Sequence, residues 1–104
     1  MKPARRGRLV MTAYWQHTSL GFRLRVRPSR YGRAHAATVP EVALRQAVKA
    51  AAPTPLSLSP RIRHSLLSQL RCHAVFATHK PSWNVETWRP DVGYLKTVLA
   101  ACNP

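Results

Sequence analysis

The sequence has 104 residues, of which 17 are Lys or Arg and only 3 are Asp or Glu, so its formal net charge at pH 7 is +14. The length suits one domain, the hydrophobic content of 45% is sufficient for a modest core, and no run approaches the ~20 apolar residues of a membrane span. Because Glu41, Glu86 and Asp91 are its only acidic side chains, the composition argues against two-metal nucleases, glycosidase carboxylate pairs and hard-cation sites. No spacing typical of zinc ligands recurs, and we expect neither a metal nor another cofactor.

The positive charge is concentrated near the N-terminus, where nine of the seventeen cationic residues precede Ala34. Such a charge attracts polyanions, including nucleic acid, acidic envelope polymers and lipid headgroups, or an acidic protein. We expect a basic N-terminal tail over residues 1–8 and a single domain over residues 9–104. The tail has the positive character of a signal-peptide start, but no convincing apolar region or cleavage site follows it. Either a signal has been removed or export does not use that route.

Residues 22–27 have the clearest periodicity in the chain. Phe22, Leu24 and Val26 alternate with three arginines, and a period of two predicts a strand with one apolar and one basic face. Residues 18–21 suit a turn, and the preceding segment supplies a partner strand, so we expect a basic N-terminal hairpin that ends near Pro28. Residues 29–33 are predicted to form a basic loop.

The remainder of the chain predicts three helices, which makes the fold class α+β. The first covers about 38–52, with Thr38 as its N-cap, and the second covers about 59–79. The third opens at Asp91, after an extended loop over 81–90. Its apolar face is expected to contain Leu95, Val98, Leu99 and Cys102.

The arginine face of the predicted strand is the sharpest candidate for a binding site. Successive arginines on one side of a strand lie about 6–7 Å apart, which is similar to the spacing of phosphates along an extended polyanion. The alternative is that arginine only solvates the outer face of a half-buried strand. The proposed anion-binding residues are Arg23, Arg25, Arg27, Arg30 and Arg33.

A second candidate site lies near the end of the second predicted helix. A metal-independent ribonuclease needs no carboxylate and can use histidine, lysine and arginine. On this interpretation the catalytic residues are His73, His79, Lys80 and Arg89. In the structural alternative, His73 is a histidine at the edge of the core. His79 and Lys80 then lie at the helix C-terminus, where their positive charge is favourable to the helix dipole.

The two cysteines, Cys72 and Cys102, are compatible with one disulfide in a secreted protein or with two buried thiols in a cytosolic one. The Cys-His pair at 72–73 and the motif Lys-Pro-Ser-Trp-Asn-Val-Glu-Thr-Trp-Arg-Pro at 80–90 resemble a family of small exported actinobacterial proteins, domain of unknown function 2599. The resemblance covers residues 14–104 and implies export and a Cys72–Cys102 bridge. It implies no activity. The chain departs from that family in lacking the usual signal peptide, in having Ser68 before Gln69, and in being more basic.

The 80–90 motif has two interpretations. It is either a rigid packed loop in which Glu86 pairs with Arg89 or Lys80, or a recognition loop built from Trp83, Asn84, Glu86 and Trp88. The favoured function is a small secreted or envelope-associated domain that binds a polyanion, such as nucleic acid or an envelope polymer, or an acidic protein. The alternative is a toxin domain with metal-independent ribonuclease activity. A third interpretation is a basic subunit neutralised by an acidic cognate protein.

Overall fold

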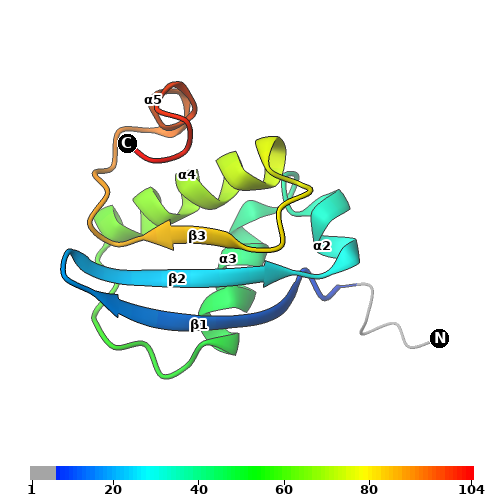
Figure 1. Cartoon of the computed structure of the whole chain (residues 1–104), viewed down its shortest axis with the longest axis horizontal. Coiled ribbons are helices and arrows are strands. Elements are labelled where there is room, and N and C mark those ends of the chain that lie inside the picture. Colours follow the sequence, from blue (N-terminus) through cyan, green and yellow to red (C-terminus); the bar gives the residue numbers. More distant parts are fainter. Residues whose placement is uncertain (1–6) are drawn as a thin grey trace.

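A three-stranded antiparallel sheet with strand order β1-β2-β3 is covered on one face by helices (Figure 1). The computed structural model describes residues 7–104, so most of the expected basic tail over 1–8 lies outside the described residues. The α+β class is confirmed, with four helices in the described part of the chain rather than the three expected. The elements are β1 (Val10–Thr18), β2 (Gly21–Pro28), α2 (Arg30–His35), α3 (Pro40–Ala50), α4 (Pro60–Phe76), β3 (Trp83–Glu86) and α5 (Tyr94–Leu99).

The first two strands pair in antiparallel register through a tight turn in which Thr18 lies opposite Gly21. The period-two alternation of β2 sets its two faces. Leu24 and Val26 are fully buried against the helices, whereas the arginines at alternating positions occupy the opposite face. The apolar and basic halves of the pattern therefore fall on the two faces of the sheet.

The core lies between the sheet and the two long helices. Leu66, Leu70 and Ala74 recur every four residues on α4 and are at most 2% exposed, because this spacing keeps them on one helix face. Trp83 from β3 packs into the same core and donates its indole N–H to the carbonyl of Ala77 at 2.8 Å. Each fully buried leucine contributes about 1.5–3 kcal/mol of hydrophobic stabilisation.

The predicted basic loop at 29–33 is wrong, because this segment begins helix α2. Ser29 is its N-cap, and its hydroxyl accepts from the Gly32 amide at 2.8 Å. Gly32 allows the helix to touch the preceding chain, since a Cβ at this position would lie 1.9 Å from the Leu9 carbonyl oxygen. A short polar segment with a good cap and one glycine thus forms a helix when a packing surface is available.

Helix boundaries differ from the prediction in three places. Thr38 is not an N-cap, because Val39 holds that position and Thr38 donates to the His35 carbonyl. Helix α4 ends at Phe76 and α5 begins at Tyr94, each three residues inside the expected limit.

The expected apolar stripe of the last helix is also wrong. Leu95 and Leu99 are 72% and 77% exposed, Thr97 is the buried residue, and Cys102 lies beyond the helix end.

Strand β3 replaces part of the loop expected at 81–90, and side chains of α4 close its outer edge. The Gln69 amide accepts from the Glu86 backbone N–H at 2.8 Å and donates to the Glu86 carbonyl at 2.9 Å. One turn further along α4, His73 donates its Nε2–H to the Asn84 carbonyl at 3.1 Å. A helix therefore supplies hydrogen bonds that a neighbouring strand would otherwise make.

Candidate functional site

The face of the sheet turned away from the helices is called here the outer face. Its rows follow from the strand register, which places Tyr14, Arg25 and Asn84 side by side. The next row begins with Gln16 on β1. In full, the outer face consists of Thr12, Tyr14 and Gln16 from β1, Arg23, Arg25 and Arg27 from β2, and Asn84 and Glu86 from β3.

One end of the outer face is an ion-pair cluster centred on Glu86. This carboxylate is only 5% exposed and accepts from the Nε of Arg23 at 2.7 Å and from the Nε of Arg89 at 2.9 Å. Both guanidinium groups also lie within 6 Å of the Trp88 ring centroid. Because Arg23 already has a carboxylate and an aromatic partner, it is less available to a ligand than the sequence predicted.

The middle of the outer face leaves two arginines without an acidic partner. Neither Arg25 nor Arg27 makes an ion pair with any residue in the range 7–104. Together with Tyr14 they line a shallow hollow of about 220 Å³ in which the remaining walls are short polar side chains and a proline. The lining residues of this hollow, at about 220 Å³, are Thr12, Tyr14, Arg25, Arg27, Pro81 and Ser82.

The other two predicted binding arginines lie apart from this hollow. Arg33 uses its guanidinium to hold the turn after α4, donating to the carbonyls of Thr78 at 2.6 Å and Lys80 at 2.5 Å. Arg30 borders a separate, open hollow of about 560 Å³ with Tyr31 and Arg8. The structure thus places the five predicted arginines in four different surroundings.

The four residues of the ribonuclease interpretation have separate surroundings. Burial lowers the pKa of His73, with a smaller lowering from Lys80, although the hydrogen bond to the Asn84 carbonyl acts in the opposite direction. His79 and Lys80 are exposed in the turn after α4. Arg89 is held by Glu86. This interpretation stays a prediction, and the Nε2 of His73 is engaged in a structural hydrogen bond with the Asn84 carbonyl.

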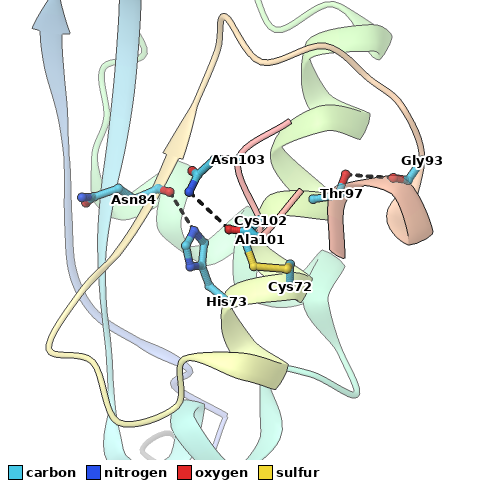
Figure 2. The surroundings of a disulfide bond; sticks show 8 residues. All are labelled: Cys72, His73, Asn84, Gly93, Thr97, Ala101, Cys102 and Asn103. Carbon is cyan, nitrogen blue, oxygen red and sulfur yellow. Dashed lines mark hydrogen bonds between the residues drawn. A yellow bond between two sulfur atoms is a disulfide. The ribbon is translucent and has the colours of Figure 1, made fainter. Parts of the chain in front are cut away.

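The single disulfide joins Cys72 on α4 to Cys102 near the C-terminus, with a Cα–Cα distance of 5.5 Å (Figure 2). Both cysteines are buried, and Cys102 and the preceding Ala101 have positive φ angles of 71° and 54°. Figure 2 shows His73 following Cys72 on α4, with its ring directed toward the backbone of Asn84. The bridge closes the C-terminal segment onto the helix that also orders β3.

The sequence prediction missed the outer-face residues of β1 and one residue just before β3, whereas Asn84 and Glu86 of β3 were among the predicted recognition-loop residues. Tyr14 and Ser82 border the arginine hollow, and neither was a candidate binding residue. Gln16 and Asn84 each have a buried side-chain oxygen without a hydrogen-bond partner among residues 7–104. Extending the period-two alternation back into β1 would have placed Tyr14 and Gln16 beside the arginines.

Two further observations concern residues 7–104. No three His, Cys, Asp or Glu side chains of this range lie close enough together to hold a metal ion. Within the same part of the chain, none of the helices combines the length and the apolar character that crossing a bilayer requires.

Residues 10–104 match the sequence profile of the family described as Protein of unknown function (DUF2599). The chain belongs to this family. Over 102 residues it is 35% identical to Uncharacterized protein Mb0487 of Mycobacterium bovis and to Uncharacterized protein Rv0477 of Mycobacterium tuberculosis. These matches cover 93% of the chain but 66% of each relative, so the DUF2599 chain spans slightly less than two thirds of their length. No solved structure matches it.

Proposed function

We propose that this DUF2599 protein is a secreted or envelope-associated domain that binds an anionic partner through the outer face of its sheet. The observation that carries the proposal is the pair Arg25 and Arg27, which share one face of β2 and lack an acidic partner within residues 7–104. Guanidinium groups bind phosphate and carboxylate through parallel N–H donors, so two of them beside a hollow suit a ligand with repeated negative charges.

The proposal narrows the arginine set that the sequence suggested. Arg23 and Arg33 hold the fold together through Glu86 and the turn after α4, whereas Arg25 and Arg27 have no such task. Tyr14 adds a half-exposed aromatic ring to the same hollow. The site therefore combines two cationic groups, one ring and the hydroxyls of Thr12 and Ser82.

Export is part of the proposal because of the bridge between Cys72 and Cys102. Disulfides persist in oxidising compartments and are rare in the cytosol of mesophiles. A charge of +14 outside the membrane would meet the acidic polymers of a cell envelope or an acidic secreted protein.

The test measures binding of labelled polyphosphate over a range of salt concentrations. Replacing Arg25 and Arg27 together by Ala should weaken binding about tenfold at low salt and reduce the slope of log K against log salt by about 1–2. Fluorescence anisotropy of the labelled polymer gives both quantities.

The matched control removes the same charge from the helix-covered side of the molecule. Arg45 on α3 and Arg61 on α4 are exposed and make no ion pair with residues 7–104, so the Arg45→Ala, Arg61→Ala double variant has the same net charge. It should retain most of the affinity. Equal losses in the two double variants would show that only total charge matters and would refute a site on the outer face.

A further inference from the structure

Strand β1 has an open edge beyond Met11, since the carbonyls of Val10 and Met11 accept hydrogen bonds from the Arg8 side chain. It borders the sheet on one side, whereas the opposite border, β3, is closed by Gln69 and His73 (Figure 1). In a two-residue hairpin the residues that flank the turn exchange hydrogen bonds, and the pattern then alternates along the strand. The backbone N–H and C=O groups of Ala13, Trp15 and His17 consequently point away from β2.

Nothing in residues 7–104 pairs with these groups. None of the hydrogen bonds between elements uses the backbone of Ala13, Trp15 or His17. The connection between α3 and α4 passes below β1 in Figure 1, but no backbone hydrogen bond joins it to the strand. Two of the three buried side-chain polar atoms that lack a partner among residues 7–104, Trp15 Nε1 and Gln16 Oε1, also belong to this strand.

The sequence of β1 does not protect this edge. Val10–Thr18 contains no Pro, Lys, Arg, Asp or Glu, which are the residues that usually prevent an edge strand from pairing with another chain. Pairing of two copies is opposed instead by the charge of the whole molecule, since each copy carries +14. The charge of such an edge therefore favours pairing with a strand of opposite charge over pairing with a second copy.

We propose that the open edge of β1 binds an acidic, extended segment of a partner protein as a fourth strand of the sheet. This inference rests on the proposed function and names the chemistry of its partner. An added strand would lie about 9–10 Å from β2, because neighbouring strands are ~4.8 Å apart. Its outward side chains would lie beside Thr12, Tyr14 and Gln16, and acidic ones could extend over the small Thr12 side chain toward Arg27.

A polypeptide fits this surface better than a nucleic acid does. Strand addition uses the row of backbone donors and acceptors on β1 as well as the positive charge, and only a polypeptide offers a matching row. Main-chain hydrogen bonds would then provide affinity along the edge, while the pairing of carboxylates with Arg25 and Arg27 would select an acidic sequence.

The experiment uses a labelled peptide as long as β1 that alternates Glu with Val and Thr. Its control is the same peptide N-methylated at every residue, which keeps the charge but cannot form a ladder. We expect the control to bind about tenfold or more weakly, since the main-chain hydrogen bonds of the ladder are lost. Amide hydrogen exchange followed by NMR should show the N–H groups of Ala13, Trp15 and His17 becoming protected only with the unmodified peptide.

A variant at the edge gives an independent measurement. His17→Pro removes one outward N–H from an exposed position, and an edge strand tolerates proline there. The substitution should weaken binding of the unmodified peptide and leave binding of the N-methylated control unchanged. Strand addition would be overturned if both peptides bound equally and the three amides stayed unprotected. In that case the proposed function would still stand if the Arg25→Ala, Arg27→Ala variant bound polyphosphate more weakly than the wild type. Protection of these amides in a dimer of the protein alone, seen by sedimentation, would also overturn the proposal.

Discussion

At the scale of single residues, Gln69 is the side chain on which most of the local structure depends. It is fully buried and makes hydrogen bonds to the N–H and C=O of Glu86, while its Nε2 also donates to the Ser65 hydroxyl at 3.0 Å. Ser65 in turn donates to the Arg89 carbonyl at 2.7 Å. These two polar residues of α4 fix the backbone on both sides of the Glu86 carboxylate, and so they position the Arg23 and Arg89 pairs.

We predict that Gln69→Leu lowers the free energy of unfolding by about 2–4 kcal/mol. The substituted side chain keeps the apolar volume but leaves a buried N–H and a buried C=O of β3 without partners, and each such group costs about 1–3 kcal/mol. Urea unfolding of the disulfide-bonded protein measures the change. Ser68→Ala is the control, because the neighbouring Ser68 side chain makes no hydrogen bond within residues 7–104. A loss under about 1 kcal/mol for Gln69→Leu would show that β3 does not need this amide.

Residue-level prediction succeeded where the cause is local or where the family resemblance supplied the contact, and it failed for a distant partner that neither revealed. The alternation of apolar and basic side chains in β2 needs only neighbours in sequence, and the family resemblance implied the Cys72–Cys102 pair. The pairing of Arg23 with Glu86 joins residues 63 positions apart and depends on β3 lying beside β2. Sequence periodicity contains no information about that contact, so Arg23 was grouped with the arginines that have no partner.

At the scale of elements, α5 depends on a covalent bond more than on an apolar face. Its leucines face solvent, its buried residue is Thr97, and the bridge from Cys102 connects the following turn to α4. The sequence stripe predicted the opposite burial, because a regular helix through Cys102 would have placed Leu95 and Leu99 on the side of the cysteine. The helix ends at Leu99 instead, and the turn to Cys102 with positive φ brings the sulfur back to α4.

We predict that replacing both cysteines by Ala loosens α5 while the sheet stays folded. Opening a bridge between residues 30 positions apart should lower the free energy of unfolding by about 3–4 kcal/mol on the chain-entropy account. Hydrogen exchange with mass spectrometry should show faster exchange in residues 94–104 and little change in β2. Wild-type protein held under reductant should behave in the same way. Continued protection of α5 in both samples would contradict a dependence on the bridge.

Two elements could not be predicted from their own sequences. Strand β3 has four residues inside a segment rich in Trp and Pro, and its hydrogen bonds come from β2 on one side and Gln69 on the other. Helix α2 has six residues and depends on the contact of Gly32 with Leu9. Tertiary contacts stabilise both elements, because the local propensity of such short segments is weak. The long helix α4 could be predicted because its apolar residues recur with a helical period.

At the scale of the whole molecule, the charge of +14 is spread over a fold with a radius of gyration of 12.8 Å. At about 10 mM salt the screening length is ~30 Å, so charges on opposite sides of the protein repel one another. At about 300 mM salt the screening length falls to ~6 Å and only near neighbours interact. Three acidic residues cannot offset this repulsion, and one of them, Glu86, is already paired locally with Arg23 and Arg89.

We predict that the protein becomes more stable as NaCl rises from about 10 to 300 mM, by on the order of 1 kcal/mol, because screening relieves self-repulsion in the compact state. Urea unfolding at each salt concentration measures this dependence. Reversing two exposed charges on the helices, with Arg45→Glu and Arg61→Glu, should reduce the slope, since it lowers the net charge without touching the outer face. If stability fell with rising salt, screening of the ion pairs around Glu86 would outweigh the relief of the global repulsion. The charge would then affect stability through local contacts and not through repulsion over the whole fold.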